Sequence, residues 1–297
     1  MNLSNYIPSN PMQIKAMQEV QNTVVQHGAM TTIINDVVAM AMMMQSVKSP
    51  AGILIQAEPG MGKTLILQLV RDEINHRVTS NFGEKKTVSI NLDAAVDVIR
   101  MAGFFTRALG YPTLPSTGRL EGMNVMIEKA MQRLQPVVTT IDETQHICEG
   151  NRDITARTVT DWLKVRMDQF NFAIICAGTI GLDRLSTINP QFTSRASANY
   201  LIHPFSYDQN WLSLLDSFAK SIQTVNMALI SQGGAKKLHT ATKGNMRTLK
   251  RILTYAAESA ALNPNLQLQM KDLEWAYDRH AGSAGVAGGQ LNPFRTN

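Results

Sequence analysis

Eight consecutive residues in the first quarter of the chain have the composition of a loop that binds phosphate. The run is Ala57-Glu58-Pro59-Gly60-Met61-Gly62-Lys63-Thr64, between an apolar stretch and a helical pattern. In this context, backbone N–H groups and a helix N-terminus can surround phosphate oxygens. Glycines permit the close backbone approach that such a loop needs. The sequence therefore predicts a nucleotide site at Glu58, Pro59, Gly60, Met61, Gly62, Lys63, Thr64 and Leu65.

Two side chains of this loop would act directly on the nucleotide. Lys63 is expected to reach the β- and γ-phosphates, and the Thr64 hydroxyl is expected to bind Mg²⁺. Ala57 departs from the pattern G-x-x-x-x-G-K-[ST], in which this position is glycine. It lies at a strand end, where a methyl group is tolerable. An ordinary glycine-rich turn is the alternative, and the strand–loop–helix register argues against it.

A second motif places two carboxylates after an apolar strand, residues 137–141. Asp142 would hold Mg²⁺, and Glu143 would orient and deprotonate an attacking water. Ligands bind at the carboxyl edge of open parallel sheets, so we expect this strand to neighbour strand 53–56. Alone, a strand followed by Asp-Glu usually marks only the start of a helix. Its pairing with the phosphate loop favours a catalytic interpretation.

Three further polar residues follow at positions where they could contact nucleotide. Thr179 comes after strand 173–177, and it would lie between the acids and the γ-phosphate. Arg195 precedes the last strand and could reach a neighbouring subunit's nucleotide as an arginine finger. Arg247 follows the stop and cap signals Gly244 and Asn245 and would project toward the γ-phosphate. For both arginines the alternative is a solvent-exposed basic side chain.

Strand and helix patterns alternate over most of the chain, which predicts an α/β fold with a parallel sheet and right-handed crossovers. We expect strands at 53–56, 87–92, 137–141, 173–177 and 200–202. After residue 204 only helical patterns follow, one of them at 224–231. The expected organisation is an N-terminal helical segment 1–50, an α/β core 51–204, a helical lid 205–280 and a mobile tail 281–297.

Composition sets limits on the class of protein. With 44% hydrophobic and 17% charged residues, the chain should form a packed globular fold. Its longest apolar run, residues 37–44, is too short for a membrane span, and no secretion signal begins the sequence, so we expect a cytoplasmic protein. Cys148 and Cys176 are interpreted as reduced core thiols. The net charge of +5 would favour a polyanion, although the basic stretch 236–251 is equally typical of a solvated helix face.

These motifs, in this order and at these spacings, resemble those of the AAA+ ATPases and, more narrowly, of the TniB/TnsC family of transposition regulators, relatives of the B protein of phage Mu. The similarity covers roughly residues 25–280 and is carried by Gly60–Thr64, Val137–Glu143, Gly178–Thr179, Arg195 and Gly244–Arg247. The resemblance implies ATP and Mg²⁺ as ligands, with Lys63, Glu143, Thr179, Arg195 and Arg247 acting in hydrolysis.

The same resemblance implies partners. Members of this family assemble into rings or helical filaments on double-stranded DNA, and they recruit a DDE transposase together with a target-selector protein of the TniQ type. Hydrolysis would then disassemble the filament. DNA contacts are expected from loops of the core, with Lys85, Lys86, Thr117 and Arg119 as candidates, although all four could be solvated surface.

Two other functions remain open from the sequence. One is a different AAA+ machine, of the initiator, clamp-loader or secretion-associated type. The other is an adaptor that binds nucleotide and never hydrolyses it. Glu143 argues against the adaptor, because a protein that only binds nucleotide does not need a general base.

Overall fold

The computed structural model describes residues 10–78, 86–111, 120–149, 153–287 and 291–295. The chain divides into two compact units. The core unit is Ala29–His203, and the helical unit combines Met1–Gly28 with Pro204–Asn297. The change from strands to helices after residue 204 in the sequence thus coincides with a unit boundary.

The core unit is built on a five-stranded parallel sheet with strand order β2-β3-β4-β1-β5. The strands are β1 (Gly52–Ala57), β2 (Thr87–Asn91), β3 (Val138–Asp142), β4 (Ala173–Gly178) and β5 (Ala196–Ile202). Because every strand pair is parallel, all five carboxyl ends meet at one edge of the sheet. The expected α/β fold with a parallel sheet is confirmed.

One expectation about the sheet is wrong, because β1 and β3 are not neighbours. β4 lies between them and pairs with both: Gln56 of β1 is opposite Gly178, and Ile141 of β3 is opposite Cys176. All three strands are buried along their whole length, as apolar runs predict for central strands. The ends of β1 and β3 are therefore separated by the end of β4.

The edge strand β5 is longer than the expected residues 200–202, since it begins at Ala196. Its residues alternate between partly buried and exposed. Within the described part of the chain it pairs on one side only, with β1. Alternation is the pattern of a strand with one solvated face, and polar residues such as Ser197 and Asn199 hid it from a search for apolar runs.

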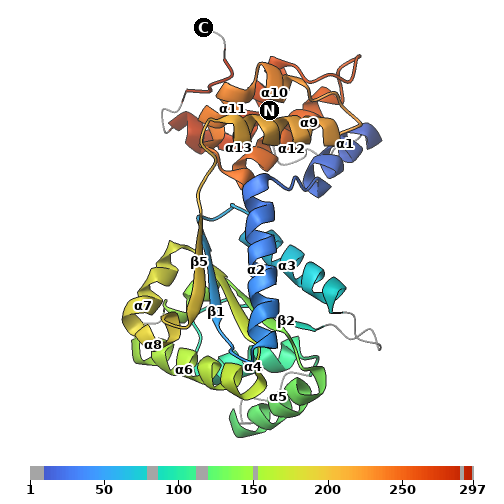
Figure 1. Cartoon of the computed structure of the whole chain (residues 1–297). Coiled ribbons are helices and arrows are strands. Elements are labelled where there is room, and N and C mark those ends of the chain that lie inside the picture. The colour runs from blue at the N-terminus through green and yellow to red at the C-terminus, as the bar shows by residue number, and fades with distance from the viewer. Residues whose placement is uncertain (1–9, 79–85, 112–119, 150–152, 288–290, 296–297) are drawn as a thin grey trace. The chain divides into compact units, whose positions relative to one another are not determined.

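Helices cover both faces of the sheet (Figure 1). On one face α2 (Gly28–Ser46) and α3 (Lys63–Arg77) share an apolar cluster with Ile53, Ile55 and Ile175. On the other, α4 (Val98–Ala108), α5 (Leu120–Leu134) and α6 (Asp153–Phe170) pack against strand residues that include Ile141 and Ile174. Burying each such side chain contributes about 1.5–3 kcal/mol, so the two clusters fix the strand ends firmly.

Short helical turns follow the ends of β3 and β4. The turn η3 (Thr144–Ile147) comes directly after the acidic pair, and η4 (Ile180–Asp183), α7 (Arg184–Ile188) and α8 (Pro190–Thr193) connect β4 to β5. None was expected, because turns of four or five residues are too short to show a helical period.

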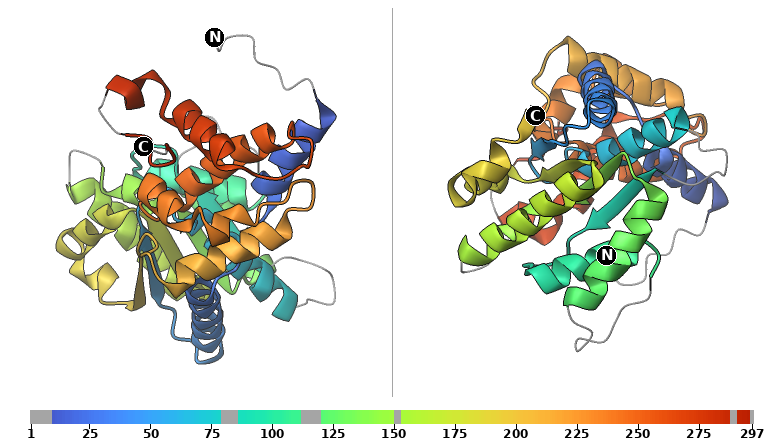
Figure 2. Two further views of the ribbon diagram at one scale, coloured as in Figure 1. Left: turned by 90° about the horizontal axis from the view of Figure 1, so that it is seen from above. Right: turned by 60° about the horizontal axis from the view of Figure 1, so that its bottom comes forward.

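The helical unit contains α9 (Gln209–Ser221), α10 (Leu229–Gln232), α11 (Ala235–Thr242), α12 (Met246–Ala260) and α13 (Met270–Ala287), together with α1 (Pro11–Asn22). Figure 2 shows the blue α1 beside the orange and red helices of this unit. The expected helix 224–231 is wrong in its first half, where Asn226 forms a β-bridge with Gln267. Among the described residues, no helix is both long and apolar enough to cross a bilayer.

The first helix belongs to this unit because it packs along α12. Lys250 Nζ donates to the carbonyl of Gln21 at 2.7 Å, and Gln21 Nε2 donates to Thr254 Oγ1 at 2.7 Å. Ala16 and Val20 are fully buried in the same apolar cluster as α12. Residues 1–50 are consequently divided between the two units, in contrast to the single segment expected.

The end of the chain also differs from the expected tail 281–297. α13 continues to Ala287, and Phe294 is only 1% exposed, with its ring 6.0 Å from that of Tyr277. Asn292 Nδ2 donates to the carbonyl of Glu274 at 2.9 Å. Residues 291–295 therefore belong to the fold, and periodicity missed them because a single aromatic anchor has no period.

Candidate nucleotide site

The loop between β1 and α3 has the conformation that its glycines allow. Gly60 and Gly62 have φ values of 91° and 87°, in the left-handed region. Gly62 is the N-cap of α3, which begins at Lys63. Residues with a Cβ rarely adopt this backbone, so the two glycines set the loop shape. Ala57, at the position where glycine was expected, is the buried last residue of β1.

The side chain of Lys63 is folded inside this loop. It is only 6% exposed, and Nζ donates to the carbonyls of Ala57 at 2.9 Å and Glu58 at 3.3 Å. These carbonyls belong to the same loop whose N–H groups would surround a phosphate. The loop therefore holds a buried ammonium group at its centre, where the positive charge would attract an anion such as a phosphate.

The acidic pair and the start of α3 are in direct contact. Thr64 Oγ1 donates to Asp142 Oδ2 at 2.6 Å, and the N–H of Glu143 donates to Asp142 Oδ1 at 2.9 Å. Asp142 is 7% exposed. Two motifs that are 78 residues apart in sequence therefore meet, although β4 separates their strands.

The contact of Thr64 with Asp142 fits the demands of Mg²⁺. Oxygen ligands at neighbouring corners of a Mg²⁺ octahedron lie about 3 Å apart, close to the 2.6 Å between these two oxygens. Mg²⁺ is usually held by one or two carboxylates with waters and substrate phosphates. Accordingly, no group of three His, Cys, Asp or Glu side chains is needed, and among the described residues none occurs.

Glu143 is oriented by its own backbone and by a neighbour. Its φ of 53° lies in the left-handed region, which is uncommon for a residue with a side chain. Gln145 Nε2 donates to Glu143 Oε2, and the N–H of Thr179 donates to Gln145 Oε1 at 3.1 Å. Glu143 and Thr179 are therefore linked through one amide, a connection that no local sequence pattern predicts.

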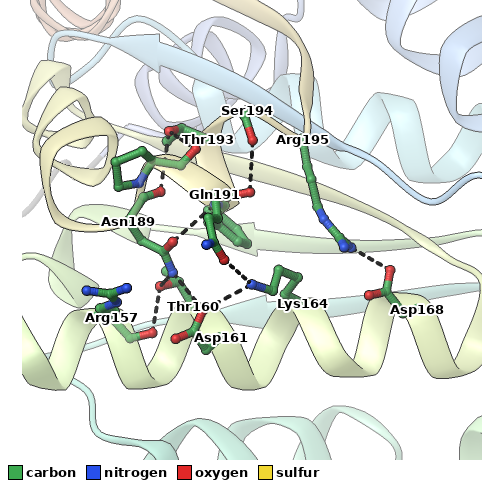
Figure 3. Close-up of polar contacts among 12 residues, drawn as sticks. Arg157, Thr160, Asp161, Lys164, Asp168, Asn189, Gln191, Thr193, Ser194 and Arg195 are labelled. Atoms are coloured by element: carbon green, nitrogen blue, oxygen red, sulfur yellow. Dashed lines mark hydrogen bonds and ion pairs between the residues drawn. The ribbon is translucent and has the colours of Figure 1, made fainter.

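Arg195 lies just before β5 and contacts α6. Its Nη1 forms an ion pair with Oδ1 of Asp168, and the two side chains are 36% and 50% exposed. Figure 3 shows this pair beside a set of polar contacts between the same helix and the segment 189–195. The residue expected as an arginine finger is thus partly exposed and held by an acid of its own chain.

Asn189 anchors that segment. It is 1% exposed, and its Nδ2 donates to Thr160 Oγ1 at 2.8 Å and to Asp161 Oδ1 at 3.0 Å. Its Oδ1 accepts the N–H of Phe192 at 3.2 Å, at the start of α8 (Figure 3). The hydrogen bond from Asn189 lowers the pKa of Asp161, and burial partly opposes this shift. Lys164 Nζ adds a second link, to Asp161 at 3.3 Å and Gln191 at 3.1 Å.

Arg247 lies in the helical unit, as an exposed residue in the first turn of α12. Asn245 caps this helix by accepting the N–H groups of Arg247 at 3.1 Å and Thr248 at 3.2 Å. Gly244 has a φ of 76°. The stop and cap signals therefore do mark the start of a helix, while a γ-phosphate contact by Arg247 stays a prediction.

Of the four expected DNA contacts, only Lys86 lies within the described residues; Lys85, Thr117 and Arg119 are outside them. Lys86 Nζ donates to the carbonyl of Leu134 at 2.6 Å, at the C-terminus of α5. Cations are favoured at this end of a helix, so Lys86 has a structural role that the sequence did not suggest.

The two cysteines are buried, and neither forms a disulfide. Burial raises the pKa of Cys148 to about 11 and that of Cys176 to about 12. A thiol with so high a pKa is protonated at neutral pH and is a poor nucleophile or metal ligand. Both residues fit their interpretation as core thiols.

Comparison with known proteins supports the same fold. A sequence model of the family described as "Bacterial TniB protein" matches residues 15–203. A search of curated protein sequences gives no match.

Solved structures with a similar fold include origin recognition complex proteins. The Aeropyrum pernix ORC2 protein, in ADPNP and ADP complexes, has a TM-score of 0.67 at 11% identity, over 92% of this chain and 74% of that one. Drosophila ORC bound to DNA has a TM-score of 0.66 at 14% identity, over 97% and 72%. The Aeropyrum pernix ORC1 protein in complex with DNA has 0.65 at 14%, over 89% and 69%. At such identities the likeness establishes the fold alone, a parallel α/β core with a helical C-terminal region.

Proposed function

Because the chain belongs to the TniB family, we propose that it is an ATP-dependent DNA-binding transposition regulator. In this proposal it oligomerises on double-stranded DNA and recruits a transposase to the target, and ATP hydrolysis drives disassembly. The observation that carries the proposal is the contact of Thr64 with Asp142, which brings a phosphate loop and an acidic pair together.

The phosphate loop would bind the triphosphate. Backbone N–H groups of residues 60–65 and the N-terminus of α3 are oriented toward an anion in loops of this kind. Lys63 would exchange its two carbonyl partners for the β- and γ-phosphates, a contact that becomes stronger as charge develops during phosphoryl transfer.

Thr64 and Asp142 would hold Mg²⁺, which when bound bridges phosphate oxygens and neutralises their charge. Glu143 would accept the proton of the attacking water. Thr179, at the end of β4, would contact the γ-phosphate from the position between the two motifs. Each of these residues lies at or directly after the carboxyl end of a central strand, or in the first turn of α3, where packing on both faces limits its movement.

Arg195 and Arg247 would sense the nucleotide from outside the loop. Arg195 would leave Asp168 and reach the nucleotide of an adjacent subunit, so that hydrolysis depends on assembly. Arg247 would contact the γ-phosphate within its own chain. Loss of that phosphate would remove the interactions favouring the assembled state, which is how hydrolysis would release subunits.

The charge distribution supports a polyanionic partner. The helical unit contains eleven Lys and Arg against seven Asp and Glu, an excess of four out of the chain's net charge of +5. Two of these lysines, Lys237 and Lys250, donate to backbone carbonyls, which leave their charge uncompensated. Excess positive charge favours phosphate contacts that are largely independent of DNA sequence. The solved relatives described as DNA complexes agree with such a role.

A calorimetric titration tests the nucleotide site. Wild-type protein should bind a non-hydrolysable ATP analogue with an affinity that falls when Mg²⁺ is omitted, and Thr64→Val should lose most of that dependence. Thr158→Val is the matched control, because the Thr158 hydroxyl donates to the Ile154 carbonyl on α6. If folded wild-type protein takes up no nucleotide in the presence of Mg²⁺, the proposal is wrong.

An initiator-type AAA+ machine is the second candidate, favoured by the TM-scores of 0.65 to 0.67 with origin recognition proteins. The two differ in the partner recruited. The transposition proposal requires ATP-dependent retention of a DDE transposase, and of a TniQ-type protein, on DNA coated with this chain. Retention of a replicative helicase in place of the transposase would support the initiator.

A further inference from the structure

Gln145 uses both ends of its side-chain amide in contacts between two candidate catalytic residues. It lies in η3, two residues after Glu143. Its Nε2 donates to Oε2 of Glu143, and its Oε1 accepts the N–H of Thr179 at 3.1 Å. A short amide that spans the acidic pair and the end of the adjacent strand fixes the distance between them.

The backbone beside Gln145 leaves room for this arrangement. A Cβ added at Gly178 would lie 2.6 Å from Oε1 of Gln145 and 3.1 Å from the side chain of Leu182. Real Cβ contacts are longer than the first of these distances, so any residue other than glycine at position 178 would displace the amide. The absence of a side chain at Gly178, the last residue of β4, therefore leaves the space that the amide of Gln145 occupies.

We propose that Gln145 is the positioning residue for Glu143, and that it ties the direction of this carboxylate to the place of Thr179 at the end of β4. The inference rests on the proposed ATPase activity and adds a residue to its machinery. Gln145 itself would touch neither nucleotide nor water.

The freedom of the Glu143 side chain makes such a residue necessary. Its left-handed backbone is set by the turn after β3, and that backbone alone leaves the side-chain torsions free. The hydrogen bond from Gln145 restricts those torsions while occupying one carboxylate oxygen. The other oxygen, Oε1, would accept a proton from water. Misplacement of a catalytic group by about 1 Å can cost on the order of 100-fold in rate.

The same amide gives Thr179 an influence on Glu143. If the end of β4 shifts when the γ-phosphate is lost, the N–H of Thr179 would pull Oε1 of Gln145, and the opposite end of the amide would move Glu143. The carboxylate would then be aligned only while Thr179 is in place. In this way the contact of Thr179 with the γ-phosphate and the alignment of the Glu143 carboxylate would depend on each other.

Three substitutions that break one or both of these contacts test the inference. Gln145→Ala removes both. Gln145→Glu retains an acceptor for the N–H of Thr179 and places a second carboxylate against Glu143. Gly178→Ala leaves Gln145 in the chain and displaces its amide. Gly103→Ala is the control, since a Cβ there meets nothing within 4 Å.

The measurements are ATP turnover and Mg²⁺-dependent affinity for an ATP analogue, both with duplex DNA present. We expect kcat to fall by roughly 10- to 100-fold in Gln145→Ala, Gln145→Glu and Gly178→Ala, with KM and analogue affinity unchanged. The double variant Gln145→Ala/Gly178→Ala should lose little more than Gln145→Ala alone, because the second change acts mainly through the amide, which lies 2.6 Å from the added Cβ while Leu182 lies 3.1 Å away.

Equal kcat in wild-type protein and Gln145→Ala would overturn the inference, and so would additive losses in the double variant. Analogue affinity of each variant confirms that it is folded, and if Gln145→Ala fails to fold, Gly178→Ala with Gln145→Glu carries the test. Failure of the proposed function is distinguishable, since wild-type protein would then hydrolyse no ATP or would be unaffected by Glu143→Gln.

Discussion

Arg195 forms an ion pair with Asp168 of α6, so the residue expected to act on a neighbouring subunit is held by an acid of its own chain. A guanidinium paired with a carboxylate has to exchange that partner before it can bind a phosphate. The pair therefore competes with any role of Arg195 between subunits.

Asp168→Asn should favour that role. An exposed ion pair contributes at most about 1 kcal/mol, so we expect the protein concentration giving half-maximal DNA-stimulated ATPase to fall about two- to five-fold. Asp153→Asn is the matched control, because Asp153 lies on the same helix as Asp168 and forms a similar ion pair, with Arg184. If Arg195→Ala abolishes the activity and Asp168→Asn leaves the concentration dependence unchanged, Asp168 does not restrain Arg195.

Lys63→Ala and Glu143→Gln should separate nucleotide binding from hydrolysis. Loss of the Lys63 ammonium should abolish ATP-dependent filaments on duplex DNA in electron micrographs. Loss of the general base should lower turnover by roughly 100- to 10,000-fold and prolong the filaments. Lys129→Ala and Glu121→Gln change the same residue types at exposed positions of α5 and should behave as wild type. Filaments of equal lifetime in Glu143→Gln and wild-type protein would argue against disassembly by hydrolysis.

Asn189→Ala should destabilise the core unit. The substitution leaves the buried Thr160 hydroxyl without its donor and uncaps α8, so a loss of about 1–3 kcal/mol in the free energy of unfolding is expected. Thermal melting measures it, with Asn210→Ala at an exposed site as control. A melting temperature unchanged within a degree would contradict the anchoring role.

The loss in Asn189→Ala should also depend on pH. The hydrogen bond from Asn189 lowers the pKa of Asp161 from its ordinary value of 3.8, so the folded state favours the carboxylate. Stability from a lowered pKa is fully present above the unfolded value and disappears as pH falls through the folded one. The difference in melting temperature between wild type and variant should be constant from pH 7 to about pH 5 and shrink below about pH 4. A difference that grows with acid would contradict the assignment.

Gly244→Ala should destabilise the helical unit. A Cβ there would lie 2.0 Å from the carbonyl oxygen of Phe205, and the φ of 76° is strained for alanine. We expect a loss of more than about 2 kcal/mol in melting experiments. Gly233→Ala, whose Cβ would meet nothing closer than 3.6 Å, is the control. Equal melting temperatures of Gly244→Ala and Gly233→Ala would refute the requirement for glycine at position 244.

The sequence predicted the parts of the fold whose signals are contiguous. β1, β3 and β4 are buried on both faces and read as apolar runs, and the phosphate loop combines strand, glycines and helix within a dozen residues. β5 was found only in part, because an edge strand alternates. The position of β4 between β1 and β3 was missed, since strand order depends on crossovers that leave no local pattern.

The supporting residues of the site could not be predicted, for a related reason. Gln145 and Thr179 are 34 residues apart, and Asn189 is 29 residues from Thr160. A lone Gln in a short turn is typical of a solvated loop, and an Asn before Pro is typical of a helix cap. Asn189 is indeed the N-cap of α8. Only the folded chain brings their second partners within reach.

The pairing of α1 with α12 sets an order of events during synthesis. Gln21 leaves the ribosome before the Lys250 that contacts it, which follows 229 residues later. At about 5–20 residues per second, α1 spends roughly 10–50 s without its partner while the core unit is completed. Ala16 and Val20, which α12 helps to bury in the folded unit, lack that cover throughout the interval, so the apolar side of α1 is completed only when the end of the chain has been made.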